Sequence, residues 1–169
     1  MILVTVGTHT MPFDRLLGAV DQIHAAGMFD ADEVVVQAGT STYRCRGCRQ
    51  FAYCTGPEFA ALLDQATLVI SHGGIGTLLR ALRRRKRVIA IPRLRRYGEH
   101  HNNHQVEICT ELARQGALFT SLDVADLPRL LACDPAALRP FDPPSRIVDQ
   151  VRAELVAFQA SLQQRGRGS

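Results

Sequence analysis

The stretch Leu68-Val-Ile-Ser-His-Gly-Gly-Ile-Gly-Thr77 decides the fold of this chain, because it runs from a short apolar segment through three glycines into a helix-forming sequence. Residues 68–70 predict a buried strand, and residues 77–84 predict a helix. Glycines between a strand and a helix let backbone N–H groups approach a phosphate, and the start of the helix adds partial positive charge. The turn therefore predicts an anion site, while the steric needs of a β–α turn remain the alternative explanation.

The alternation of strand and helix continues on both sides of this turn. Apolar runs predict further strands at residues 2–6, 33–37, 49–53, 88–91 and 118–119, and apolar residues at helical spacing predict helices at 13–23, 57–65, 102–115, 126–133 and 144–163. This pattern predicts an α/β fold, a Rossmann-like parallel sheet with helices on both faces. Ligands bind such sheets beyond the carboxyl ends of the strands. The loops that start at Gly7, Gly39, Tyr53, His72 and Pro92 should therefore converge.

Length and composition indicate one domain. The chain has 169 residues, of which 46% are hydrophobic, enough for one compact core and too few for a two-domain enzyme. We expect this single domain to span residues 1–163, with a disordered tail at 164–169. No apolar run reaches the roughly 20 residues that span a bilayer. The first six residues lack the basic region of a signal peptide, so we expect a cytoplasmic protein.

Positive charge is concentrated in residues 80–96, which contain eight arginines, Lys86 and no carboxylate. Such a stretch suits a phosphate, a lipid head group or a nucleic acid, and it is equally typical of a solvated helix end. Nucleic acid is disfavoured, because the stretch has only Tyr97, directly after it, as an aromatic residue, and single strands are bound on several stacking side chains.

A second polar cluster occupies residues 98–105, with the sequence Gly-Glu-His-His-Asn-Asn-His-Gln. Carboxylate, amide and imidazole groups supply the directional donors and acceptors that sugar hydroxyls need. Two alternatives stay open, helix capping and a metal site. The residues concerned are Asn102 and Asn103 for the cap, and His100, His101 and His104 for the metal.

The cysteines carry little functional information. Cys45-x-x-Cys48 with Cys54 resembles half of a zinc site, but a structural zinc site is usually built from two such pairs and no second pair exists. The total of five is odd, which argues against a disulfide framework. We interpret these residues as loop or core thiols.

Taken in order, these motifs resemble the C-terminal-domain-like glycosyltransferases of family 28, in particular the Alg13-like and PssE-like subunits of two-component enzymes. The resemblance covers roughly residues 2–120. It rests on Val4-Thr-Val-Gly-Thr-His9, Phe13-Asp-Arg-Leu16, Gln37-Ala-Gly-Thr-Ser-Thr-Tyr43, Ser71-His-Gly-Gly-Ile-Gly-Thr77, and Pro92-Arg93 with the 98–105 cluster. It implies a single nucleotide-sugar-binding domain equivalent to the C-terminal half of a GT-B fold, with a UDP-sugar donor and no cofactor or metal.

The resemblance also implies roles for individual residues. The donor diphosphate would be held by Gly7, Thr8, Ser71, His72, Gly73, Gly74, Gly76 and Thr77. The donor sugar would be contacted by Glu99, His100, Asn103 and Gln105, and the uracil would be bordered by Tyr53 and Cys54. The sequence departs from the family at Arg80, where many relatives have a glutamate that binds the ribose hydroxyls. An arginine cannot accept those hydrogen bonds.

The implied reaction is an inverting transfer of a hexose to a lipid-linked glycan or exopolysaccharide intermediate. The glycine turn would stabilise the leaving diphosphate. A membrane-associated Alg14-like or PssD-like partner subunit would carry the acceptor site and the catalytic base, with His9 as the alternative base in this chain. The protein would then lie at the inner face of the membrane through its partner. A non-catalytic nucleotide-sugar-binding or activating subunit is the competing interpretation.

Overall fold

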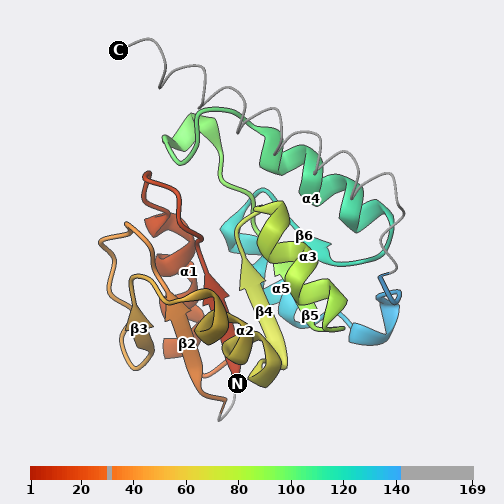
Figure 1. The fold of residues 1–169 in the computed structure, drawn as a ribbon, viewed down its shortest axis with the longest axis horizontal. Coiled ribbons are helices and arrows are strands. Elements are labelled where there is room, and N and C mark those ends of the chain that lie inside the picture. The colour runs from red at the N-terminus through yellow and green to blue at the C-terminus, as the bar shows by residue number, and fades with distance from the viewer. Residues whose placement is uncertain (30–31, 142–169) are drawn as a thin grey trace.

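A computed structural model of the chain describes residues 1–29 and 32–141 and contains one six-stranded parallel sheet (Figure 1). The strands lie in the order β3-β2-β1-β4-β5-β6, with β1 in the middle. Their bounds are Ile2–Thr5 for β1, Val34–Gln37 for β2, Arg49–Phe51 for β3, Leu68–Ser71 for β4, Arg87–Ala90 for β5 and Phe119–Thr120 for β6. The register places Thr5, the last residue of β1, beside Gln37 of β2 and Ser71 of β4. This strand order is that of a Rossmann-like fold.

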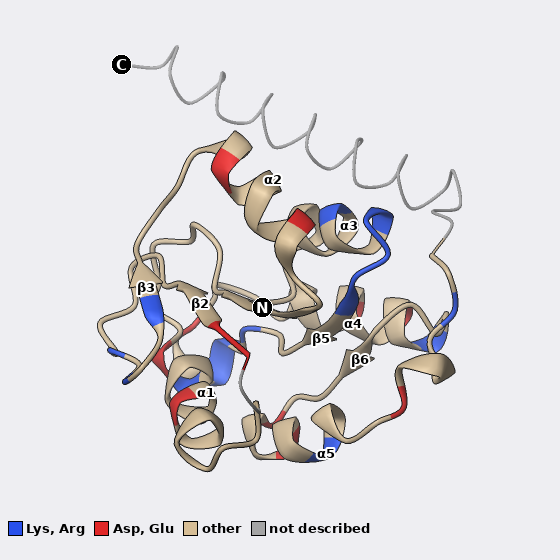
Figure 2. Ribbon diagram, turned by 90° about the horizontal axis from the view of Figure 1, so that it is seen from below, with Lys and Arg blue, Asp and Glu red and all other residues tan. Residues whose placement is uncertain are grey.

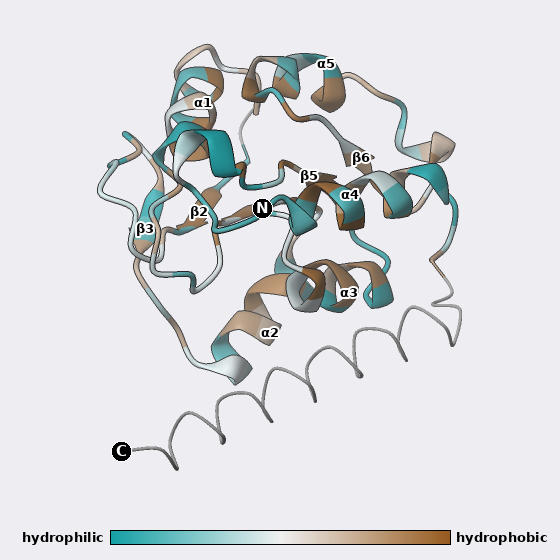
Figure 3. Ribbon diagram, turned by 90° about the horizontal axis from the view of Figure 1, so that it is seen from above, coloured by the Kyte–Doolittle hydropathy of each residue, from teal (hydrophilic) through white to brown (hydrophobic). Residues whose placement is uncertain are grey.

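Helices cover both faces of the sheet. The α-helices are α1 (Asp14–Ala25), α2 (Gly56–Gln65), α3 (Ile75–Arg83), α4 (His104–Arg114) and α5 (Leu127–Leu131), and three short 3-10 helices are η1 (Arg95–Tyr97), η2 (Val124–Asp126) and η3 (Pro135–Ala137). Apolar residues of α1 and α5 pack in one core cluster, and those of α2, α3 and α4 pack in the other. Figure 3 shows the two layers on opposite sides of the sheet.

Side chains alternate between these two cores along each strand. Ile2 and Val4 belong to the core beneath α1, whereas Leu3 belongs to the core beneath α2 and α3. All four residues of β1, β2 and β4 are buried. Strands that are buried on both faces read as continuous apolar runs, which is why the sequence located them well.

The predicted α/β fold is confirmed, with small shifts at element ends. The helix predicted at 77–84 begins earlier, at Ile75, so that Gly76 lies in its first turn. The segment predicted as a helix at 126–133 is a short α5 preceded by η2. The predicted helix at 144–163 and the predicted tail at 164–169 lie outside the described residues.

The start of α2 is held by a capping box. Glu58 N donates to Thr55 Oγ1, and Thr55 N donates to Glu58 Oε2 over 2.7 Å. Pro57 stands in the first turn, where its missing N–H costs no hydrogen bond. These contacts fix the loop between β3 and α2, which borders the site described below. Within the described part of the chain, no helix has both the length and the apolar character needed to cross a bilayer.

Candidate functional site

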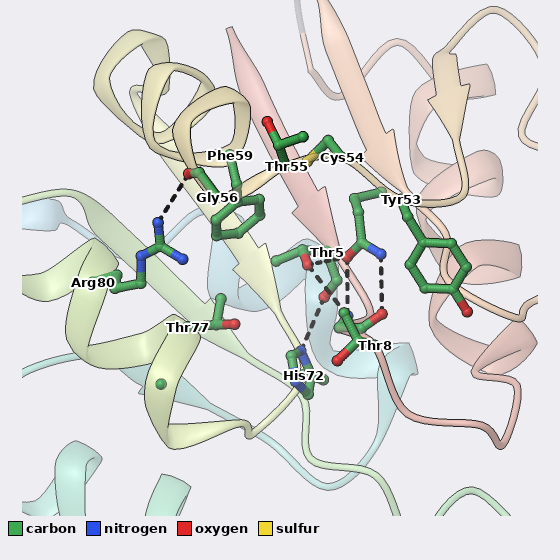
Figure 4. Close-up of a pocket in the computed structure, with 13 residues that line it drawn as sticks. Thr5, Thr8, Tyr53, Cys54, Thr55, Gly56, Phe59, His72, Thr77 and Arg80 are labelled. Carbon is green, nitrogen blue, oxygen red and sulfur yellow. Dashed lines mark hydrogen bonds between the residues drawn. The ribbon is translucent and has the colours of Figure 1, made fainter.

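The candidate site lies where the chain leaves β1 and β4 in opposite directions. The loop after β1 leads to α1 on one face, whereas the loop after β4 leads to α3 on the other face. A cavity of about 340 Å³ opens at this point, beyond the carboxyl ends of the strands (Figure 4). Doubly wound parallel sheets bind ligands at such a topological switch point.

Residues from four strand ends form the wall of this cavity. The wall consists of Thr5, Gly7, Thr8, Gln37, Tyr53, Cys54, Thr55, Gly56, Phe59, His72, Gly76, Thr77 and Arg80. Three of the five loops expected to converge, those starting at Gly7, Tyr53 and His72, therefore do so here. The loop at Gly39 lies against them, because Gly39 N donates to Ala52 O. The loop at Pro92 joins through Arg93, which donates to Val6 O.

Gln37 joins the loops that follow β1 and β3. Its Oε1 accepts the Thr5 hydroxyl over 2.6 Å and Gly7 N over 3.1 Å, and its Nε2 donates to Gly7 O over 3.0 Å and Ala52 O over 2.8 Å. This amide is buried. The sequence placed Gln37 in a motif but not in the site. A polar residue at the end of an apolar strand is the signal that could have found it.

The His72 ring is buried and neutral, and it packs between Gly7 and Gly74. A Cβ on Gly7 would lie 2.5 Å from the His72 ring, and a Cβ on Gly74 would lie 2.2 Å from it. Burial lowers the pKa of His72 to about 3, helped by the nearby Arg93 charge. The ring Nδ1 lies 3.4 Å from Thr5 O. His72 therefore shapes the turn and presents an uncharged imidazole to the cavity.

The three glycines of the turn serve different purposes. A Cβ on Gly73 would lie 2.7 Å from Gln105 Cβ and 2.8 Å from Cys109 Sγ, and the Gly73 N–H already donates to Gln105 Oε1. Packing therefore requires Gly73 and Gly74. Gly76, by contrast, has nothing within 4 Å of a Cβ position and faces the cavity. Thr77 N and Leu78 N donate to Gly74 O, so the N–H groups left open at the start of α3 are those of Ile75 and Gly76.

The residues predicted to hold a diphosphate therefore divide into two sets. Gly7, Thr8, His72, Gly76 and Thr77 line the cavity. Ser71, Gly73 and Gly74 lie behind this wall. Ser71 is fully buried, and its hydroxyl donates to His72 O over 2.9 Å. These three residues support the turn.

The 98–105 cluster shapes the loop after β5. Glu99 is buried and accepts from Arg15 Nε over 2.8 Å, from Arg15 Nη2 over 2.9 Å and from Leu94 N over 2.9 Å. The Asn103 side chain accepts from Arg95 N, and the Gln105 side chain accepts from both Gly73 N and Arg93 N. None of the four predicted sugar-binding residues, Glu99, His100, Asn103 and Gln105, lies in the wall of the 340 Å³ cavity. Their sugar contacts stay predictions.

Arg93 is the central support of this edge of the sheet. It is fully buried, and its guanidinium donates to the carbonyl oxygens of Val6, Met11, Pro12 and Glu99 over 2.7 to 3.2 Å. Burial lowers its pKa to about 10, although the nearby Glu99 carboxylate opposes that shift. The sequence placed it in the basic stretch and in the Pro92-Arg93 motif, but not among the site residues. One cation surrounded by carbonyl groups thus joins the loops after β1 and β5.

Three histidines gather beside the site. The ring centroids of His9 and His100 lie 4.6 Å apart, those of His9 and His101 lie 5.6 Å apart, and those of His100 and His101 lie 6.2 Å apart. Burial and then the neighbouring His100 and Arg93 charges lower the pKa of His9, and burial and Arg93 lower that of His100. Among the described residues, no group of three or more histidine, cysteine or acidic side chains is arranged to hold a metal ion. All five cysteines are free thiols.

His9 has one ring nitrogen committed to the backbone. Its Nδ1 accepts the N–H of Met11 over 3.1 Å. We assign the proton of the neutral ring to Nε2 from this hydrogen bond, which makes Nε2 a donor. In this arrangement His9 can donate to a phosphate or sugar oxygen, and it has no free lone pair for a hydroxyl proton.

The basic side chains of the 80–96 stretch lie in different environments. Arg93 is buried, Arg84 forms an ion pair with Asp64 over 2.8 Å, and Arg87 donates to three carbonyl groups at the end of α5. Arg80 donates to Gly56 O over 3.2 Å, and its guanidinium lies 5.2 Å from the centre of the Phe59 ring. It is the charged residue of the cavity wall, which contains no carboxylate among the described residues.

Comparison with known proteins assigns the chain to a family. The model of the glycosyltransferase family 28 C-terminal domain matches residues 1–134. The chain is 29% identical to a UDP-N-acetylglucosamine transferase subunit ALG13 from Yarrowia lipolytica, over 94% of this chain and 85% of that protein. It is 31% identical to the mouse protein of the same name, over 69% of this chain. It spans only 10% of the mouse protein and 14% of the human one.

Solved structures show the same fold. An NMR solution structure of ALG13 aligns with a TM-score of 0.58 and 18% identity, over 84% of this chain and 89% of that one. A glycotransferase of kitacinnamycin aligns with a TM-score of 0.60 and 19% identity, over 80% of this chain and 35% of that one. The family match covers the sheet, the cavity at its switch point and the loops that shape it, and so this chain belongs to the glycosyltransferase family 28 C-terminal domain family.

Proposed function

We propose that this chain is the donor-binding subunit of a two-component, inverting glycosyltransferase that takes its sugar from a UDP-sugar. The observation that carries the proposal is the cavity at the switch point, which combines the open start of α3 at Gly76 with one cation, Arg80, and no carboxylate among the described residues. A nucleoside diphosphate is anionic at one end and planar at the other. The cavity offers complementary groups for both ends.

The diphosphate would lie between the loops after β1 and β4. Gly76 and Thr77 present the first turn of α3 on one side, and Gly7 and Thr8 form the other side. Backbone N–H groups and the helix dipole stabilise negative charge there without reorganising. As the bond to the sugar breaks, charge builds on the β-phosphate of the leaving group, and groups that are already oriented toward it lower the barrier.

The nucleoside would lie toward α2. Tyr53, Cys54 and Phe59 form this part of the wall, with the Arg80 guanidinium beside the Phe59 ring. Backbone groups at 53–56 can address the edge of a uracil. Arg80 offers only N–H donors, so the ribose hydroxyls or the phosphates would act as acceptors toward it.

The catalytic base would come from a partner subunit. The hydrogen bond from Met11 N occupies Nδ1 of His9, so this histidine is better suited to donate to the donor sugar or diphosphate than to deprotonate an acceptor. The relatives named as transferase subunits support an enzyme divided between two chains. A membrane-associated partner with a lipid-linked acceptor, in glycan or exopolysaccharide synthesis, would bring this chain to the inner face of the membrane.

Calorimetric titration with UDP and a panel of UDP-sugars tests the donor assignment. The panel contains the N-acetylglucosamine, glucose, galactose and glucuronate derivatives, with GDP-mannose as a control. We expect UDP-sugars to bind and GDP-mannose to bind much more weakly. The absence of UDP-sugar binding even with the partner present would refute the proposal.

Reconstitution with the partner separates a donor-binding enzyme subunit from an activating one. The variant Gly76→Trp fills the cavity at a position with free space around it. Gly74→Trp would be a poor choice, because Gly74 packs against His72. If the Gly76→Trp chain folds and still supports full sugar transfer, the partner holds the donor and this chain only activates it.

A further inference from the structure

A second cavity lies at the opposite, amino-terminal edge of the sheet. Its volume is about 250 Å³, and its wall is formed by the end of α3, the segment leading into β5 and residues 135–141. It shares no wall residue with the 340 Å³ cavity. Figure 2 shows the basic segment between α3 and β5 that forms one side of it. This site is thus independent of the proposed donor site.

Four cations line this second cavity, and no carboxylate lines it among the described residues. They are Arg85, Lys86, Arg87 and Arg139. Two described acidic residues have other partners: Asp64 pairs with Arg84, and Asp134 accepts from Ala136 N. In the described ranges, no ion pair joins a carboxylate to any of the four. Within the described residues, no carboxylate is therefore paired with their positive charge.

Local contacts anchor these cations at the cavity. Arg139 N donates to Gly116 O over 2.9 Å, and its side chain runs over Gly116, where a Cβ would lie 3.3 Å from Arg139 Cγ. Lys86 Nζ donates to Asp64 O over 2.7 Å. Arg87 Nη2 donates to carbonyl groups at the end of α5, while its Nε is buried and has no hydrogen-bond partner. Arg87 is thus held in place by the end of α5, whereas Arg85 and Arg139 are exposed at the cavity.

Arg85 has a backbone conformation that is unfavourable for a residue other than glycine. Its φ is +54°, in the left-handed region, directly after the last turn of α3. Helices end in this conformation mostly with glycine, because a side chain there is strained. Arg85 is the one non-glycine residue with positive φ in the described chain. Strain of this kind tends to be kept where the side chain has a function.

We propose that this cavity binds a phosphate ester, with the phosphate held by Arg85, Arg87 and Arg139. The carbon chain of the ligand would lie against Leu138 and Phe141, which also line the cavity. Two sources share this chemistry, the head group of an anionic phospholipid and a small phosphate ester in solution. Both present an anionic phosphate beside a short carbon chain, and the experiment below separates them.

The test uses the full chain with two probes. Calorimetry measures binding of glycerol 3-phosphate, and co-sedimentation measures binding to phosphatidylcholine vesicles with and without phosphatidylglycerol. The double variant R85G/R139Q should bind whichever probe the unaltered chain binds at least about tenfold more weakly, since the variant lacks two charge-assisted contacts. The control R44Q/R83Q removes the same charge from exposed arginines outside the cavity and should change binding less than about twofold.

The single variant R85G controls for a loss of binding that is caused by unfolding. Glycine relieves the strain at this position, so this variant should raise Tm by about 2 °C while it weakens binding of the probe. Binding to vesicles alone identifies a lipid head group, and binding to glycerol 3-phosphate alone identifies a soluble ester. The proposal is overturned if neither probe binds, or if the control pair weakens binding as much as R85G/R139Q does.

Discussion

Replacing Gly76 by alanine should stabilise the protein and weaken its ligand, two effects of opposite sign from one methyl group. Gly76 lies in the first turn of α3, and nothing stands within 4 Å of the added Cβ. Alanine gains up to about 1 kcal/mol over glycine inside a helix, and we expect about half of that so near the end. For a chain of this length the change raises Tm by about 1–2 °C.

The same methyl group points into the proposed diphosphate site. It would prevent close approach of a phosphate to the first turn of α3 and remove at least one charge-assisted hydrogen bond, worth about 1.5–3 kcal/mol. That loss corresponds to a roughly 10- to 150-fold weaker affinity for UDP. Calorimetry with UDP and thermal unfolding without ligand measure the two effects separately.

Two other glycines provide matched controls. Gly18 lies within α1 outside the cavity wall, and a Cβ there would lie 3.6 Å from the Tyr43 ring, an ordinary contact. Gly18→Ala should therefore stabilise the protein and leave UDP affinity unchanged. Gly74→Ala places a Cβ 2.2 Å from His72 and should destabilise by about 1–3 kcal/mol. If Gly76→Ala binds UDP as tightly as the unaltered chain, the placement of the diphosphate is refuted.

Three further predictions concern the charged and titratable groups. Glu99→Gln should lower the free energy of unfolding by about 2–3 kcal/mol, because it leaves the Arg15 guanidinium without its bidentate partner; chemical denaturation measures this, and an Arg15→Met/Glu99→Met double variant that is no more stable than Glu99→Gln would contradict it. Above pH 6.5, the ordinary pKa of histidine, His72 is neutral in both the folded and the unfolded chain. Below that pH only the unfolded chain takes up the proton, so the free energy of unfolding should fall by up to about 1.4 kcal/mol per pH unit toward pH 3. In an NMR titration the His72 ring should show no protonation above pH 4 while the fold persists, and a midpoint near 6 would show that the ring is not desolvated. Arg80→Gln should weaken the binding of UDP about tenfold and that of uridine far less, as measured by calorimetry. Equal losses of affinity for both ligands would mean that Arg80 does not act through the phosphates.

The sequence was most informative about the sheet. The fully buried strands β1, β2 and β4 are mostly apolar runs, and burial on both faces makes that pattern strong. The strand-end loops could be listed in advance because parallel strands all point the same way. Helix ends were less certain: the first turn of α3 contains Gly76, a residue that local propensity excludes from a helix.

The site was predicted at the level of loops and only partly at the level of residues. Gly7, His72, Gly76 and Thr77 were identified and line the cavity. Gln37 was missed as a site residue, because its importance comes from joining two loops that are distant in sequence. Polar composition alone could not distinguish a side chain that faces a ligand from one that holds a loop.

By itself, the sequence determined the layered α/β fold, the family and the edge of the sheet where the 340 Å³ cavity lies. It did so because hydrophobic periodicity and glycine turns are local properties. Only the tertiary structure decided what each residue of the glycine turn does. Gly73 and Gly74 are required by the packing of Gln105, Cys109 and His72, and Gly76 is the one that opens to the cavity. The reason is geometric: a clash or a free space depends on residues brought together from other parts of the chain.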